Sequence, residues 1–183
     1  MSALWVHVEE LESNLAAGDG VALSGDEARH VAARRLRVGD RLIAFDGAGR
    51  TAEARIEALG KRTVELRLET IVLAPPPPSD WLLATAIPKG ERMAVMLPML
   101  TQLAVSVWQP LVLEESAVRD LDVASARLRR ILVESAKLAR RPWLLEVRPP
   151  CTLGQLLAAR GTAGGSAGVP GGLDFGDREG DGV

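Results

Sequence analysis

The chain has 183 residues, of which 47% are hydrophobic and 25% are charged, and its formal net charge is −2. This length suits one or two small domains with a real core, and the weak net charge argues against a nucleic-acid binder that uses its whole surface. Pro98, Gln102 and Gln109 interrupt the longest apolar runs, so no segment has the roughly 20 apolar residues of a membrane span. The N-terminus turns acidic where a signal peptide needs a basic start. Cys151 is the only cysteine, which excludes an intramolecular disulfide and a cysteine metal cluster. We therefore expect a cytoplasmic protein with no membrane partner and no metal.

The first 72 residues predict short strands around one helix. Ser24 is a candidate N-cap followed by acidic residues, and the helix is predicted to run through the arginine cluster at 34–37 and to end at 38–40. Asp46–Gly49 has the Asp-Gly signature of a tight hairpin turn. Strands are predicted at 4–8, 41–45, 51–57 and 63–73. Short strands joined by glycine turns indicate a small β-barrel.

Four consecutive prolines, Pro75–Pro78, mark the strongest domain boundary, because such a run favours extended polyproline II structure. After them the period of the apolar residues changes. Strands are predicted at 81–87, 105–113 and 143–147, and amphipathic helices at 91–104 and 123–141, with Leu103 and Leu138 in their respective apolar stripes. The continuous apolar run at 81–87 predicts a strand covered on both faces. The βαβαβ order implies parallel strands, hence an α/β module.

The predicted division of the chain is a β-barrel at 1–74, a proline-rich linker at 75–79, an α/β domain at 80–160 and a tail at 161–183. Residues 152–160 have the pattern of a short helix. The tail contains nine glycines and almost no periodic apolar residues, so we expect it to be disordered.

The turn between the strand at 81–87 and the following helix holds the strongest single-site candidates. Lys89 and Arg92 flank Gly90, at the position where open α/β sheets bind anionic ligands. Lys-Gly turns are common, however, and the sequence contains no complete nucleotide-binding motif.

Two basic clusters each have a functional and an ordinary explanation. The arginines at 34–37, with His30 upstream, suit a phosphate backbone, but a solvated basic helix end is somewhat more common. The helix at 123–141 carries six bases that we expect on one face, opposite an apolar stripe. These are Arg127, Arg129, Arg130, Lys137, Arg140 and Arg141. Glu134 lies four residues after Arg130, and an ordinary i,i+4 ion pair explains it at least as well as catalysis does.

Several stretches, in order, resemble the ribosomal RNA small subunit methyltransferase E family. They are LSGDEARHV at 23–31, RLRVGD at 35–40, FDGAG at 45–49, AIPKGERM at 86–93, TQLAVSVWQPL at 101–111 and ESAKLARR at 134–141. The resemblance implies a PUA-like β-barrel followed by a SPOUT-type α/β domain. It also implies S-adenosylmethionine (SAM) as cofactor, methylation of N3 of a uridine in 16S rRNA of the small ribosomal subunit, and a cytoplasmic homodimer.

The resemblance assigns roles to particular residues. RNA contacts are implied for His30, Arg35, Arg37, Lys89 and Arg92. Candidate catalytic residues are Lys89, Arg92, Glu134 and Arg141.

The chain also departs from the family pattern. Met99, Gln102, Ala104 and the pair Leu138-Ala139 replace usual family residues, and Pro98 interrupts the first helix. The GPEGG loop and the LGxRILRxETA segment, which build the family's knot and cofactor pocket, are absent, so the resemblance places no cofactor residue. We therefore expect a divergent, C-terminally truncated member with little or no activity by itself. The alternatives are a non-catalytic RNA-binding protein derived from the family and a frameshifted product that does not fold stably.

Overall fold

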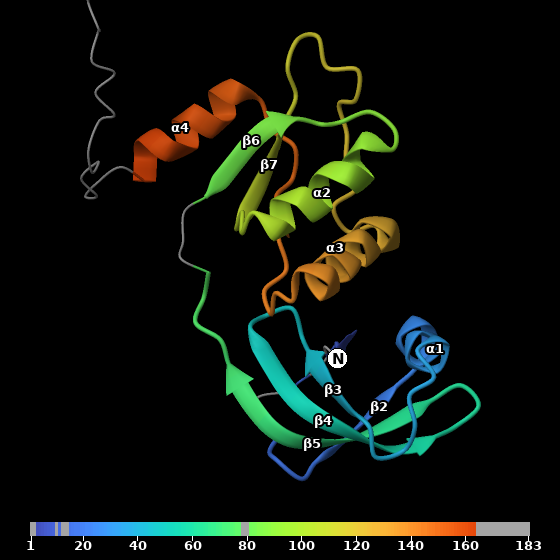
Figure 1. The fold of residues 1–183 in the computed structure, drawn as a ribbon. Helices are drawn as coiled ribbons and strands as arrows, with labels where there is room; N and C mark the ends of the chain where they lie inside the picture. The colour runs from blue at the N-terminus through green and yellow to red at the C-terminus, as the bar shows by residue number, and fades with distance from the viewer. Residues whose placement is uncertain (1–2, 10, 12–14, 78–80, 164–183) are drawn as a thin grey trace, which may run out of the picture.

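The computed structural model describes residues 3–9, 11, 15–77 and 81–163. The chain forms two modules, each with its own sheet (Figure 1). The N-terminal module is a curled five-stranded sheet with one helix, and the second is a three-stranded sheet with three helices. The predicted class, a β module followed by a parallel α/β module, is confirmed. The domain boundaries themselves stay a prediction.

The N-terminal sheet has the strand order β1-β3-β4-β5-β2. Its strands are β1 (Leu4–His7), β2 (Gly20–Leu23), β3 (Arg41–Phe45), β4 (Arg50–Leu59) and β5 (Val64–Leu73). The strand β1 is parallel to β3, and the other neighbours are antiparallel. In Figure 1 the long strands β4 and β5 curl beneath the helix, which gives the module its barrel-like shape. Among the described residues, no hydrogen-bonded ladder joins β1 to β2, so strand pairing does not close the sheet.

The helix α1 (Gly25–Ala33) ends earlier than the sequence predicted. It stops at Ala33 and does not continue through the arginine cluster, since Arg35 adopts a φ of +55°. The reason is tertiary. Leu36 packs against the core of the N-terminal sheet, and the chain must leave the helical path to bring it there. Ser24 takes the N-cap position, but its side chain makes no capping hydrogen bond.

The predicted hairpin turn between β3 and β4 is confirmed. An oxygen of the Asp46 carboxylate accepts hydrogen bonds from the backbone N–H groups of Ala48 (2.7 Å) and Arg50 (3.0 Å). Gly47 and Gly49 have φ values of +80° and +98°, which only glycine adopts without strain. The shape of this turn therefore depends on hydrogen bonds and glycines within the turn itself.

The second module is the predicted βαβαβ unit, extended by one helix. Its elements are β6 (Leu82–Ala86), α2 (Arg92–Gln102), β7 (Val107–Leu111), α3 (Ala126–Ala139), β8 (Glu146–Val147) and α4 (Leu153–Ala163). The strands are parallel in the order β6-β7-β8. Figure 1 shows α2 and α3 together on one side of the sheet and α4 beside β6, away from them. Trp108 of β7, with Leu97 and Leu100 of α2, is at the centre of the core.

Three expectations about this module are wrong in detail. The strand β6 lies at the sheet edge and is only half-buried, so it is not covered on both faces; β7 is the central strand. Leu103 and Leu138, assigned to apolar stripes, are 65% and 74% exposed. The third strand is limited to β8, because residues 143–145 turn toward the N-terminal module.

The helix α4 extends the predicted helix at 152–160 and includes residues 161–163, so the predicted disordered tail does not begin at residue 161. The rest of that tail, 164–183, lies outside the described residues, as do linker residues 78–80. Pro98 lies inside α2, which continues past it. None of the described helices is both long and apolar enough to cross a membrane.

Candidate functional site

The turn Asp46–Gly49 of the N-terminal module docks on the segment between α3 and β8. The N–H of Gly49 donates to the carbonyl of Pro142 (3.0 Å), and the N–H of Leu144 donates to the carbonyl of Gly47 (2.9 Å). A β-carbon at Gly49 would overlap the indole of Trp143, and one at Gly47 would lie 2.6 Å from the Leu144 side chain. Glycine is therefore required here twice, for the positive φ and for the close approach of another segment.

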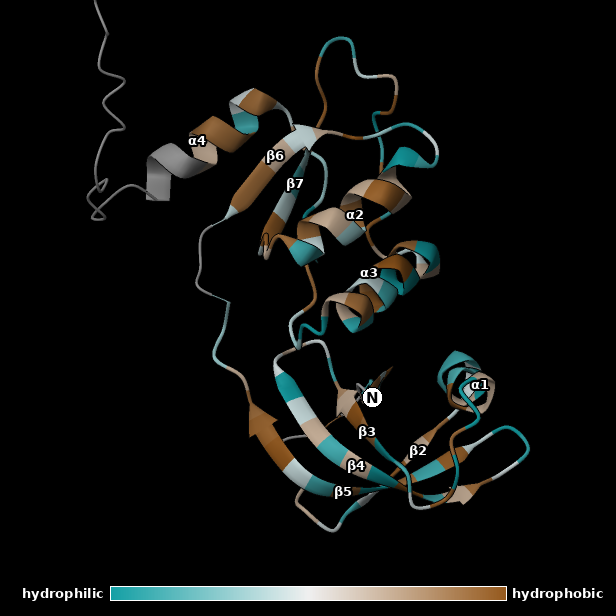
Figure 2. Cartoon of the chain, in the orientation of Figure 1, coloured by the Kyte–Doolittle hydropathy of each residue, from teal (hydrophilic) through white to brown (hydrophobic). Residues whose placement is uncertain are grey.

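A small apolar cluster extends this contact along α3. Phe45 of β3 is fully buried together with Val133 and Ala136 of α3. Trp5 of β1 packs on Phe45, with ring centroids 5.4 Å apart and a tilt of 53°. One face of α3 thus covers the N-terminal sheet while another faces the core of its own module. In Figure 2 the helix shows brown apolar stretches between teal polar ones, as a helix with two contacts requires.

A buried ion-pair cluster joins the same two modules. The Lys137 side chain is only 6% exposed, and its Nζ lies 2.8 Å from Oε1 of Glu27 in α1 and 2.6 Å from Oε1 of Glu134. A buried ammonium group needs such partners, because desolvation is costly for an unpaired charge. Lys137 therefore does not belong to a solvated basic face, and Glu134 pairs with it and not with Arg130. The second oxygen of Glu27 is buried and has no hydrogen-bond partner.

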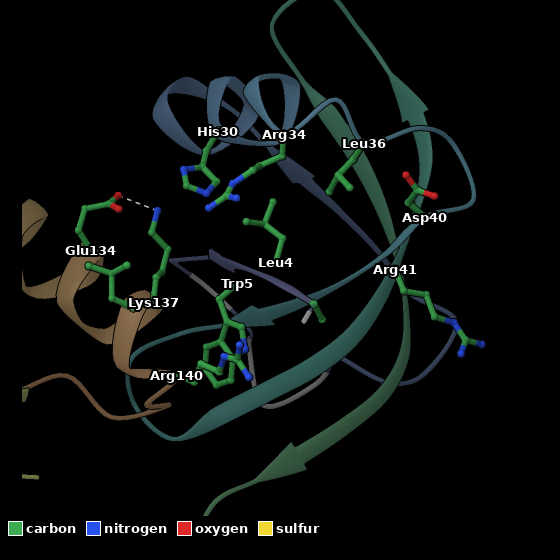
Figure 3. Close-up of a pocket in the computed structure, with 12 residues that line it drawn as sticks. Leu4, Trp5, His30, Arg34, Leu36, Asp40, Arg41, Glu134, Lys137 and Arg140 are labelled. Atoms are coloured by element: carbon green, nitrogen blue, oxygen red, sulfur yellow. Dashed lines mark ion pairs between the residues drawn. The ribbon is translucent and has the colours of Figure 1, made fainter. Parts of the chain in front are cut away.

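A cavity of about 620 Å³ lies between the modules, beside this ion-pair cluster. Figure 3 shows His30 and Arg34 of α1 on one side of it, Leu4 and Trp5 of β1 below, and Glu134, Lys137 and Arg140 on the side of α3. Ala3, Leu36, Asp40, Arg41 and Leu138 complete the lining. Two predicted site residues, His30 and Glu134, meet here although they are far apart in the sequence.

The cavity has an excess of uncompensated cations. Arg140 and Arg34 are exposed, and no side-chain hydrogen bond or ion pair engages either of them within the described part of the chain; His30 beside them is half-buried. The Lys137 charge is compensated by its two glutamates, and Arg41 pairs with Glu69 at 3.1 Å. Cationic groups without partners at a cavity rim suit an anionic ligand.

The other predicted site residues lie elsewhere. Lys89 and Arg92 are exposed at the turn before α2, at the carboxyl end of β6, and Gly90 there has a φ of +64°. Glu134 and Arg141 lie toward the opposite ends of the parallel strands, because the chain runs from the end of α3 to the start of β8. The four candidate catalytic residues therefore do not line one cavity.

Arg35 and Arg37 are exposed in the turn that follows α1 and do not line the cavity. From the sequence, Arg34 belongs to a cluster that suits a phosphate backbone and Arg140 to a basic helix face, and nothing singled out Trp5. For the two arginines, the neighbouring basic residues in the sequence were a signal that could have indicated an anion-binding site. Nothing local could have placed Trp5 against α3.

A smaller cavity of about 380 Å³ lies near the start of α1 and is lined in part by His7, Glu9, Asp26 and Glu27. Burial lowers the pKa of His7, and the hydrogen bond with the backbone carbonyl of Asp46 (3.2 Å) opposes that shift in part.

Within the described ranges, no three side chains are arranged to hold a metal ion.

Two family models match this architecture. The model described as RNA methyltransferase PUA domain matches residues 23–69, and the model described as RNA methyltransferase domain matches residues 75–164. The ribosomal RNA small subunit methyltransferase E of Synechocystis is 32% identical over 123 residues, which are 67% of this chain and 40% of that protein. The enzyme of the same name from Rickettsia conorii is 28% identical over 72% of this chain and 54% of its own length. The matched models and the named relatives show that the chain is similar to the ribosomal RNA small subunit methyltransferase E family.

Two solved structures have the same fold. A small subunit methyltransferase E of Neisseria gonorrhoeae, bound to S-adenosyl methionine, has a TM-score of 0.74 and 25% identity, and the match covers 85% of this chain and 65% of that one. A methyltransferase of Legionella pneumophila, in complex with the same cofactor, gives a TM-score of 0.72 at 24% identity over 86% of this chain and 66% of that one. The chain thus spans 40% of the length of the Synechocystis family member and about two thirds of the length of these two structures.

Proposed function

We propose that this chain acts in the SAM-dependent methylation of small-subunit ribosomal RNA, at N3 of a uridine in 16S rRNA. The observation that carries the proposal is the pair of domain matches, an RNA methyltransferase PUA domain followed by an RNA methyltransferase domain in one fold. The named family members support the substrate, and the cofactor-bound neighbours support SAM. A cytoplasmic location and a homodimer belong to the same proposal.

The cavity between the modules does not fit SAM. SAM carries a sulfonium, an ammonium and a carboxylate group and is a net cation at neutral pH, whereas Arg34 and Arg140 add uncompensated positive charge at the rim. Like charges brought together at low dielectric repel one another. The side chains of this cavity suit a phosphate, and no step of methyl transfer can be derived from them.

Exposed cations on the surface support the RNA-binding part of the proposal. On the outer face of the N-terminal sheet, Arg55 and Arg67 are paired with glutamates at 2.8 and 2.7 Å and are therefore partly neutralised. Among the residues that the structure describes, Arg35 and Arg37 have no such ion pairs, and they adjoin Arg34 and Leu36 of the cavity lining. Lys89 and Arg92 form a second exposed basic site, at the carboxyl end of β6. Cations of this kind make the phosphate contacts that position RNA.

The decisive experiment measures methyl transfer and cofactor binding in the same preparation. Purified chain is incubated with radiolabelled SAM and small subunits that lack the modification, and SAM is titrated separately by calorimetry. Incorporation at a uridine N3 with micromolar SAM binding would establish the enzyme and refute the expectation of an inactive chain. A protein that neither binds RNA nor transfers methyl groups would refute the proposal.

The second candidate is RNA binding without chemistry. It is favoured by one observation, that the cavity with the free arginines fits an anion and not the cofactor. It predicts RNA binding that weakens as salt increases, with no methyl incorporation. Replacing Arg35 and Arg37 with Ala should weaken that binding. Unchanged affinity would exclude the turn after α1 from the RNA surface.

A further inference from the structure

The cavity between the modules combines a charged rim with an apolar floor. Leu4, Trp5 and Leu36 come from the N-terminal module, and Leu138 comes from α3. Leu138 is 74% exposed and adds apolar surface beside the charged rim. The volume of about 620 Å³ lies in the range of roughly 300 to 1,000 Å³ typical of small-ligand pockets. A ligand that matches both parts has an anionic group and a flat apolar group.

The cationic side chains of the rim come from different modules. Arg34 directly follows α1, whereas Arg140 directly follows α3 and has a φ of +51°. The docked turn and the Lys137–Glu27 pair fix the distance between these two elements. The backbone positions that carry the two arginines are therefore fixed before a ligand binds, and only their side chains need to be ordered.

We propose that this cavity binds one unstacked nucleotide of a single-stranded RNA. Arg34 and Arg140 bind the two phosphates that flank it, and the base lies against the apolar floor beside Leu138. Proteins commonly recognise single-stranded RNA through bases that are splayed out and packed on side chains. The inference rests on the proposed RNA-binding function and adds a defined subsite, which neither module forms alone.

The test compares variants in the binding of a fluorescein-labelled, single-stranded 16S rRNA fragment, followed by anisotropy at several salt concentrations. Arg34→Ala and Arg140→Ala should each weaken binding roughly ten-fold, as expected for a lost charge-assisted hydrogen bond. The double variant should lower the salt slope by about 1.4, which is the value for two phosphate contacts in a single strand. Arg127→Ala is the matched control, because Arg127 is exposed on α3 and does not line the cavity.

The base contact is tested separately with Leu138→Ala and with an RNA that is abasic at single positions. The variant should weaken binding of the intact RNA, and one abasic position should produce the same loss and abolish the effect of the variant. All substituted side chains are exposed, and circular dichroism verifies the fold of each variant.

The outcomes separate this inference from the proposed function. If the wild-type chain binds and methylates RNA but the arginine double variant binds as tightly as wild type, the nucleotide subsite is refuted and the function stands. If every abasic RNA binds like the intact one, the cavity holds phosphate only and the inference is also refuted. If the wild-type chain does not bind RNA, both fail.

Discussion

Replacing Gly49 with alanine should break the contact that holds the two modules together. Gly49 has a φ of +98°, and a β-carbon there would overlap the Trp143 indole. Gly18 provides a matched control, since its φ is +99° and a β-carbon there would meet nothing within 4 Å. The two substitutions carry the same backbone strain, and only one carries the clash.

The magnitudes follow from these two contributions. Holding a non-glycine residue at such a φ costs about 1–3 kcal/mol. Overpacking a well-packed contact costs about 1–3 kcal/mol more. Gly18→Ala should therefore lower the free energy of unfolding by about 1–3 kcal/mol, and Gly49→Ala by about 2–6 kcal/mol.

Urea unfolding followed by circular dichroism measures both changes, with the m-value as a check on cooperativity. In a Trp143→Leu background the clash is relieved, so Gly49→Ala should then cost about as much as Gly18→Ala. A second transition in Gly49→Ala would show that the modules now unfold separately. Equal losses for the two alanine variants in the otherwise wild-type chain would refute the docking argument.

Three further predictions follow from buried or constrained groups. Lys137→Met leaves the carboxylate of Glu27 buried without its partner and should lower the free energy of urea unfolding by about 3 kcal/mol. This value is toward the low end for a broken buried pair, because the Glu27 side chain keeps 15% exposure. Adding Glu27→Gln should restore stability, and no recovery would contradict the ion-pair account. Because burial lowers the pKa of His7 from its ordinary value of 6.5, the unfolded state takes up the proton first as the pH falls, so stability should decline from about pH 7 toward pH 5. His7→Gln should flatten this decline in urea titrations at each pH and His30→Gln should retain it, whereas an equal decline in both variants would exclude His7 as the cause. Pro98→Ala restores a backbone N–H donor inside α2 and should raise the free energy of unfolding by about 1–3 kcal/mol in urea titrations. A lower free energy of unfolding would show that the proline suits its site.

Local sequence patterns determined which segments form helices, strands and turns, and that the strands of the second module are parallel. The strand β3 was predicted at 41–45 and is found at Arg41–Phe45, because an apolar run between turn residues is a local signal. The turn Asp46–Gly49 was predicted from residue chemistry and forms through its own aspartate. The parallel order of β6, β7 and β8 followed from alternation with helices. The exposed turn with Lys89 and Arg92 was also placed correctly at the start of α2, although its role stays a prediction.

Tertiary structure alone decided what surrounds the cavity. Helical spacing assigned Leu138 to the core and Lys137 to the solvent, and the structure reverses both, since α3 packs on two modules while periodicity describes only one apolar face. The end of α1 was set by Leu36, whose partners lie in distant strands. Trp5 reaches the cavity through its contact with Phe45 and the docking of α3. Sequence spacing encodes the periodicity of each element, but the interface between the modules depends on contacts between residues far apart in the chain, such as Gly49 with Pro142 and Glu27 with Lys137.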